Sequence, residues 1–97
     1  MTTYRRIGAV KTAIDIIGML ADQREPISGK DLADALNLPH GTVMSHLATF
    51  EDANWVRRVG EYFETGQALA AIWARKKAAL SSKIANLTNE LDELEGK

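Results

Sequence analysis

The fold is decided by residues 28–56, whose sequence is SGKDLADALNLPHGTVMSHLATFEDANWV. Ser28 is a favourable N-cap, because its hydroxyl can accept from a first-turn amide, so a helix is predicted to begin there. Asn37 ends this helix, and Pro39 opens the next one, where its fixed φ and missing N–H cost nothing. Asn54 suits the left-handed conformation that terminates the second helix. Two short helices joined by a turn of about three residues predict a helix-turn-helix.

The segments on either side complete a winged helix. Residues 55–64 change to a β-rich pattern around Gly60-Glu61, which predicts a two-residue hairpin with a type II′ turn. Pro26 closes a helix predicted over residues 7–21, and Ile27 after it is expected to be extended, as in a short strand. The apolar stripe of that helix is predicted to consist of Ile7, Val10, Ile14, Ile17 and Ala21, widened by Ile16 and Leu20. The predicted fold is mostly α, with three helices and a hairpin wing over residues 4–66.

Residues 67–97 are predicted to form a long helix that dimerises. Thr65 is a fair N-cap for it, and no breaker follows Gly66. A helix of ~30 residues is about 45 Å long, too long to be covered by so small a domain. We therefore expect its apolar residues to pair with a second copy in a dimeric coiled coil. They follow a heptad seam that contains Trp73, Leu80, Ile84, Leu87, Leu91 and Leu94.

The charges of this helix favour an antiparallel pair. Its earlier half is basic and its end is acidic, through Arg75, Lys76, Lys77 and Lys83 and then Glu90, Asp92, Glu93 and Glu95. A parallel pair would put like charges side by side, whereas an antiparallel pair brings Lys83 of one helix to Glu90 of the other. The apolar residues alone fit either orientation. We therefore favour an antiparallel homodimer on charge and register together.

The middle of the chain resembles the DNA-binding domain of IclR-type transcriptional regulators. The phrase Leu-x-Leu-Pro-x-x-Thr-Val at residues 36–43, followed by Leu47-Ala48-Thr49 and the wing, carries a resemblance that covers about residues 8–66. It implies a winged helix that contacts the major groove through its third helix. Such regulators usually continue into a larger effector-binding domain, but this chain ends at Lys97, so we expect a regulator that lacks that domain. The family also tends to carry an arginine where this chain has Ser45.

The expected DNA contacts lie on the third helix and on cations around it. A recognition helix needs donors and acceptors on its exposed N-terminal half. The predicted base-side residues are His40, Thr42, Met44, Ser45 and Thr49, with Met44 available to a thymine methyl. The predicted phosphate contacts are Lys30, Arg57, Arg58, Arg5 and Arg6. Because adjacent residues of a strand point to opposite faces, only one of the two wing arginines can follow the DNA backbone easily.

The charge balance leaves a second interpretation open. Residues 1–66 hold seven Lys and Arg against nine Asp and Glu, a net charge of −2, and the whole chain carries −1. An operator-binding protein can be acidic if its cations are grouped on one face, and a homodimeric regulator on double-stranded DNA is the favoured function. The alternative is a protein–protein adaptor, in which the winged helix binds another protein and the coiled coil is an assembly handle.

Several other classes lack residue support. The chain has no cysteine, which excludes disulfides, Cys-ligated zinc, iron–sulfur clusters and a thiol nucleophile. His40 and His46 are six residues apart and do not share a helix face as metal ligands at i and i+4 do, so His46 is expected to be half-buried and structural. We expect no enzymatic activity, no cofactor and no metal. No apolar run approaches the ~20 residues that cross a bilayer, and the N-terminus has no signal-peptide core, so the expected location is the cytoplasm.

Overall fold

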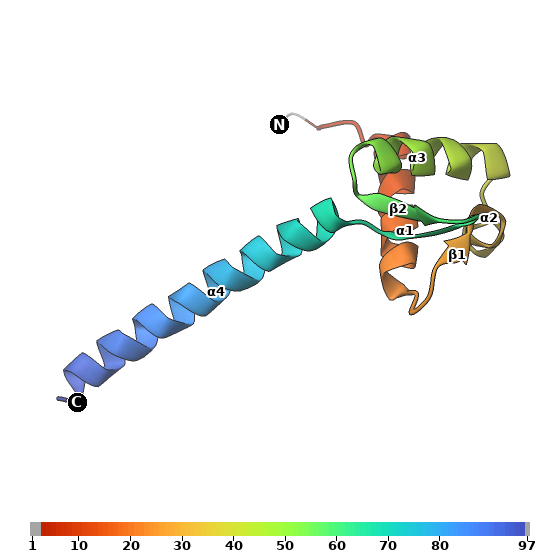
Figure 1. The fold of residues 1–97 in the computed structure, drawn as a ribbon. Coiled ribbons are helices and arrows are strands. Elements are labelled where there is room, and N and C mark those ends of the chain that lie inside the picture. Colours follow the sequence, from red (N-terminus) through yellow and green to blue (C-terminus); the bar gives the residue numbers. More distant parts are fainter. Residues whose placement is uncertain (1–2, 97) are drawn as a thin grey trace.

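The computed structural model describes residues 3–96, in which a small domain of three helices and three strands is followed by a fourth, long helix. Figure 1 shows α1, α2 and α3 gathered with the strands at one end, while α4 projects away from them as one uninterrupted helix. This is the predicted winged helix-turn-helix with a long C-terminal helix. Its elements are α1 (Gly8–Asp22), β1 (Ile27–Ser28), α2 (Gly29–Leu36), α3 (His40–Asp52), β2 (Val56–Val59), β3 (Tyr62–Thr65) and α4 (Gln67–Leu94).

The helix-turn-helix is bounded by the local signals that its sequence contains. The Ser28 hydroxyl accepts a hydrogen bond from the Asp31 amide at 3.1 Å and so caps α2. Asn37 ends α2 in the left-handed region, with φ 55°. Pro39 occupies the N-cap of α3, and Asn54, with φ 62°, lies just beyond its end. The predicted starts and ends of both helices are therefore confirmed, because each depends on interactions between residues close in sequence.

The wing is part of a three-stranded antiparallel sheet with the order β1-β3-β2. Val59 pairs with Tyr62 across a two-residue turn at Gly60-Glu61, as predicted. Gly60 has φ 63°, a conformation that the first central residue of a type II′ turn requires and that glycine adopts without strain. The expected short extended segment at Ile27 is β1, which pairs with Phe63 of β3 and so adds the third strand.

The core lies between the sheet and the three short helices, and it corrects the predicted apolar face of α1. Ile16 and Leu20 are the residues of α1 that are buried, whereas Ile7, Val10 and Ile14 are 64%, 52% and 64% exposed. The prediction was wrong because α1 carries apolar residues on two adjoining faces, and the other elements cover only one of them. The buried residues are Ile16, Leu20, Leu32, Ala33, Val43, Leu47, Val56 and Phe63, and Ile17 packs against them while half-buried.

The junction between the wing and α4 is a close backbone contact. Thr65 is the last residue of β3 and pairs with Val56, so the prediction that it caps α4 was wrong, and Gly66 stands at the N-cap instead. The Gly66 amide donates to the Trp55 carbonyl at 2.7 Å, and the Ala68 amide donates to the Asn54 carbonyl at 3.0 Å. A Cβ added at Gly66 would collide with the Asn54 carbonyl oxygen. Glycine is therefore required here by space, and the Ala68 amide ties the first turn of α4 to the end of α3.

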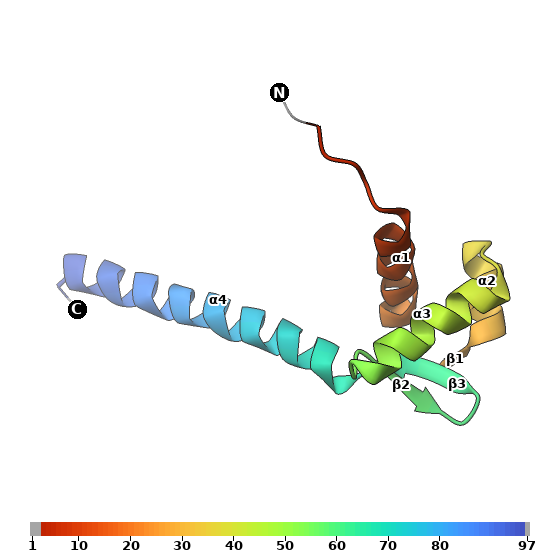
Figure 2. The ribbon, with the colours of Figure 1, turned by 90° about the horizontal axis from the view of Figure 1, so that it is seen from above.

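The apolar seam of α4 is exposed along its length. No residue of Gln67–Leu94 is buried, and the predicted seam residues are between 47% and 87% exposed. Figure 2 shows α4 leaving the domain on a course well separated from α1. The last residue of the predicted dimerisation segment, Lys97, lies outside the described residues. Within residues 3–96, no helix combines the length and the apolar character that crossing a bilayer demands.

Candidate nucleic-acid interface

The outer face of α3 presents a row of polar side chains. Ser45 and Thr49 are exposed on it, and Thr42 is half-buried on the same face. His40 is exposed at the start of α3 but lies on the side of α2, with its Nε2 3.8 Å from the position that a Cβ of residue 29 would take. The Thr49 hydroxyl donates to the Ser45 carbonyl at 3.0 Å, so its oxygen can still accept a hydrogen bond from outside. The structure therefore places these four predicted residues on the helix that a winged helix inserts into the major groove. The row offers single hydrogen bonds and no bidentate fork.

Met44 does not belong to this exposed row. It is half-buried and packs against the core, and its Sδ lies where a side chain of residue 29 would begin. Gly29 is buried at the start of α2, so the missing side chain there makes room for the methionine. Met44 therefore joins α2 to α3, and the prediction of a thymine contact is not supported by its position.

His46 connects α3 to α1. It is half-buried, with Nδ1 2.8 Å from the Thr42 carbonyl oxygen and Nε2 3.4 Å from the Ala9 carbonyl oxygen. The structural role expected for it is thus confirmed. Because Ala9 lies in the first turn of α1, this contact also places the start of α1 beside the middle of α3.

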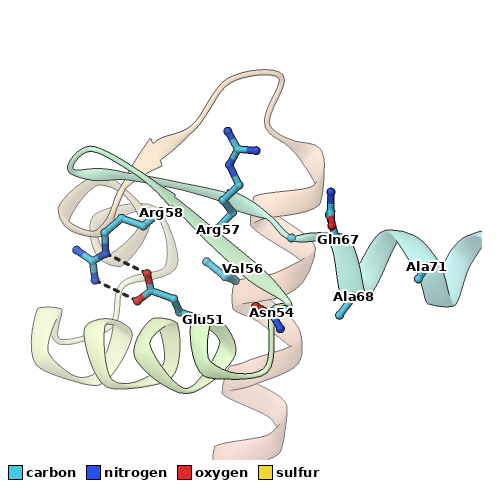
Figure 3. Close-up of a pocket in the computed structure, with 9 residues that line it drawn as sticks. Glu51, Asn54, Val56, Arg57, Arg58, Gln67, Ala68 and Ala71 are labelled. Carbon is cyan, nitrogen blue, oxygen red and sulfur yellow. Dashed lines mark hydrogen bonds and ion pairs between the residues drawn. The ribbon is translucent and has the colours of Figure 1, made fainter.

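Three of the predicted phosphate-binding cations are held by acidic neighbours. Lys30 pairs with Asp34 at 3.4 Å on α2, and Arg57 pairs with Glu64 at 3.3 Å across the wing. Arg58 points to the opposite face of β2, toward α3, as Figure 3 shows. There its Nε donates to one carboxylate oxygen of Glu51 at 3.3 Å, and one of its terminal nitrogens donates to the other oxygen at 3.4 Å. The Arg58 guanidinium also lies over the Phe63 ring, 4.7 Å from its centre. The two arginines thus face opposite ways, as predicted, but both have their charge balanced.

Arg5 and Arg6 are the other two predicted phosphate-binding cations. Arg5 and Arg6 are exposed just before α1, and no ion pair within residues 3–96 involves either one. Arg6 donates to the Tyr4 carbonyl at 3.1 Å. Both arginines line a shallow surface hollow together with Ile7, Val10, Lys11 and Ile14 at the start of α1.

Glu51 is the residue of this region that sequence reasoning missed. It lies in the last turn of α3 and lines a groove of about 810 Å³ between that turn, β2 and the first residues of α4 (Figure 3). Arg58 comes seven positions after Glu51 and lies on a different element, so no local spacing rule links the two residues. No group of three or more potential metal ligands occurs among the described side chains.

The comparisons with known proteins agree with this geometry. Residues 9–60 match the model of the IclR helix-turn-helix domain. No curated protein matches the chain. Among solved structures, the chain is similar to an IclR transcriptional regulator from Alicyclobacillus acidocaldarius (TM-score 0.68, 19% identity, 74% of this chain and 30% of the other). It is also similar to a proposed IclR-type regulator from Silicibacter sp. TM1040, with a TM-score of 0.67 and 20% identity over 75% of this chain and 29% of the other. The repressor BlcR of Agobacterium tumefaciens is similar with a TM-score of 0.62 and 20% identity, over 72% of this chain and 28% of the repressor.

These structural likenesses establish the fold. The chain spans less than a third of the length of each of these regulators. The family match ends at Gly60 in the turn of the wing, so it includes α1, α2, α3 and β2 and leaves α4 outside.

Proposed function

Because the chain belongs to the family of IclR helix-turn-helix domains, we propose that it is a transcriptional regulator that binds double-stranded DNA as a homodimer. The observation that carries the proposal is the row of polar side chains on the outer face of α3, and the exposed Arg5 and Arg6, which form no ion pair within residues 3–96, support it. In this proposal α3 enters the major groove, where His40, Thr42, Ser45 and Thr49 face base edges. Arg5 and Arg6, in the segment before α1, contact phosphates. The matched domain belongs to a non-enzymatic family, so the proposal includes no reaction.

The homodimer is proposed to form through α4. Its seam is exposed from Trp73 to Leu94, and apolar residues at heptad spacing are the pattern with which helices pair. We favour the antiparallel orientation, because it sets the basic half of one helix against the acidic end of the other. A 28-residue helix is about 42 Å long, so such a pair would hold the two winged helices at opposite ends. This requires widely spaced half-sites, or DNA that is looped or bridged.

Ser45→Ala is expected to alter sequence preference without abolishing binding. Ser45 can give one hydrogen bond to a base edge, and the loss of one such bond changes relative affinities by roughly fivefold. The measurement is selection of bound DNA from a random pool, with the wild-type and variant pools compared position by position. Identical preferences in the two pools would remove Ser45 from the recognition surface.

Arg58→Ala and Glu51→Gln are expected to act in opposite directions. Arg58→Ala would remove a phosphate contact, so affinity should fall for every DNA sequence. The slope of log affinity against log salt concentration (the salt slope) should decrease by ~1. Glu51→Gln removes the carboxylate that holds Arg58, so affinity should rise about threefold to tenfold on all sequences and the salt slope should steepen. Asp52→Asn is the matched control, since it removes the same charge from the neighbouring, exposed position of α3. If Asp52→Asn raises affinity equally, Glu51 acts only through net charge and does not restrain Arg58.

Cysteines that replace Lys83 and Glu90 in one chain are expected to crosslink two copies to each other. An antiparallel pair brings Lys83 of one helix beside Glu90 of its partner, and the natural chain has no cysteine to interfere. Mass spectrometry of the tryptic fragments identifies the bond. Leu94→Cys serves as the counter-test, because efficient crosslinking between two copies of that variant would show a parallel pair.

A protein–protein adaptor remains the second candidate, and the ion pairs of the wing favour it. Arg57 and Arg58 are both balanced by carboxylates, which leaves the wing without a free cation for phosphate. A gel shift with random DNA at low and moderate salt separates the two functions. A regulator should bind at low salt and lose affinity steeply as salt rises, whereas an adaptor should not bind at either concentration.

A further inference from the structure

Met44 lies on α3 but takes no part in the function proposed above. Its sulfur fills a notch at the start of α2, where the point that a Cβ of residue 29 would occupy lies 2.5 Å from Met44 Sδ. Gly29 itself is buried, and a methyl group of Leu47 lies 3.7 Å from the same point. The sulfur is therefore a contact between the first turn of α2 and the middle of α3, in surroundings that are largely apolar.

This sulfur belongs to a side chain at the edge of the core. Met44 is half-buried and packs against the buried cluster, whereas Leu47 is wholly buried within it. His40, one turn earlier on α3, is exposed, and its Nε2 also lies within 4 Å of the Cβ point of residue 29. A thioether in such a place can be reached by a small solute, and its oxidation turns a flexible apolar side chain into a polar one.

We propose that Met44 is a modification site, at which a hydroperoxide oxidises the sulfur and thereby loosens the contact between α2 and α3. The sulfur gives an electron pair to one oxygen of hydrogen peroxide, so that an S–O bond forms and the O–O bond breaks. The other oxygen leaves with the proton of the first, as water. The sulfur loses two electrons and the peroxide gains them. A thiol-dependent methionine sulfoxide reductase reverses the change.

The sulfoxide does not fit the notch that the thioether fills. An added oxygen needs space, but the sulfur already lies against Gly29 and the Leu47 methyl group, and overfilling a packed site forces its neighbours to move. The oxygen also needs a hydrogen-bond donor, because a polar group buried without one is costly. The ring of the exposed His40 is near enough to donate. The oxidised side chain should therefore turn out toward His40, and α2 should lose its contact with the sulfur.

The consequence for DNA binding rests on the proposed function, whereas the oxidation and the loosening of α2 do not. In a helix-turn-helix the first helix crosses the DNA backbone while the second enters the groove, so the two must keep a fixed relation. Val43 and Leu47 remain wholly buried, which should keep α3 in the domain. We therefore expect affinity for DNA to fall by about tenfold, the change that one uncompensated buried polar group produces, while the domain stays folded.

Met19 is the matched control, as the other methionine of residues 3–96. It is also half-buried, but it lies on α1, where its Sδ accepts a hydrogen bond at 3.5 Å from Nε2 of Gln23, one turn further along. Its sulfur thus has its polar partner beside the same helix. Oxidation of Met19 should leave the contact between α2 and α3 intact.

The test exposes the full chain to a graded series of hydrogen peroxide concentrations. Mass spectrometry of tryptic fragments locates the added oxygen, because Met19 falls in residues 12–24 and Met44 in residues 31–57. Hydrogen exchange measures the protection of the amides of α2, and titration with DNA selected from a random pool measures affinity. Oxidation of Met44 should lower the protection of α2 and the affinity together, and treatment with the reductase should restore both.

Three variants connect these effects to the notch. Met44→Leu keeps an apolar side chain of similar volume, so it should bind DNA and be insensitive to peroxide in both measurements. Met19→Leu should respond to peroxide as wild type does. Gly29→Ala places a Cβ where the sulfur lies, so it should lower the protection of α2 and the affinity without any peroxide.

Several results would overturn the proposal. One is oxidation of Met19 while Met44 stays unchanged, and another is an oxidised Met44 with undiminished protection of α2. A Met44→Leu chain that loses affinity in peroxide as wild type does would also overturn it, as would a Gly29→Ala chain with the protection of wild type. If the untreated chain binds no DNA, the proposed function fails, and the exchange of α2 before and after oxidation still decides the role of Met44.

Discussion

Removal of residues 70–97 is expected to convert a dimer into a monomer at about 1 μM and to weaken DNA binding by two to four orders of magnitude, roughly the contribution of linking two binding modules. The core contains no residue of α4, so the winged helix should remain folded. Sedimentation and a DNA titration of the truncated chain measure the two effects. Circular dichroism checks that α1, α2 and α3 persist.

The full chain with Leu87→Asp is the companion to this truncation. It keeps α4 and its charges but places a carboxylate in the apolar seam, so it should reproduce the loss of pairing without the loss of mass. A truncated chain that still sediments as a dimer at about 1 μM would rule out α4 as the main link. An unchanged affinity for DNA in a chain that has become monomeric would show that one winged helix is sufficient for binding.

Leu47→Ala is expected to lower the free energy of unfolding by about 2–5 kcal/mol, the range for truncating a fully buried leucine. Leu47 is wholly buried on the inner face of α3 and belongs to the single core cluster. Small domains have a total stability of about 5–15 kcal/mol, so the variant should be only marginally folded. Chemical denaturation measures the change. Ser45→Ala, two residues away on the exposed face, should stay within about 0.5 kcal/mol of wild type. Equal stability of the two variants would contradict the described packing of α3.

The elements of the domain were predictable from sequence because their limits are set locally. Ser28, Asn37, Asn54 and Gly60 each act through the backbone of residues within a few positions, and each has the predicted conformation. The buried face of α1 was not predictable in this way. Periodicity finds apolar residues on a helix, but α1 has two apolar faces, and only the packing of the domain decides that Ile16 is covered and Ile14 is not.

The sequence predicted which helix forms the candidate interface, but it did not predict which cations around that helix are paired with carboxylates. The resemblance to IclR-type domains and the position of Pro39 together located α3, and His40, Ser45 and Thr49 are exposed there. The inward turn of Met44 depends on the missing side chain of Gly29, which lies fifteen positions away on another helix. The ion pair of Arg58 with Glu51 likewise joins a strand to a helix. Such contacts follow from tertiary packing, which the spacing of residues along the chain does not encode.

The junction at Gly66 has a consequence for how a paired molecule could measure distance. Two backbone hydrogen bonds, from Gly66 to Trp55 and from Ala68 to Asn54, join the start of α4 to the domain, and residue 66 has no room for a side chain. In a dimer paired through α4, a joint that keeps this geometry would make the length of the helix set both the separation and the relative rotation of the two winged helices. One inserted residue would lengthen α4 by about 1.5 Å but turn everything beyond it by about 100°. Seven would add about 10.5 Å with a net turn of only about 20°. The spacings of operator half-sites open to such a scaffold would therefore be discrete and separated by whole heptads.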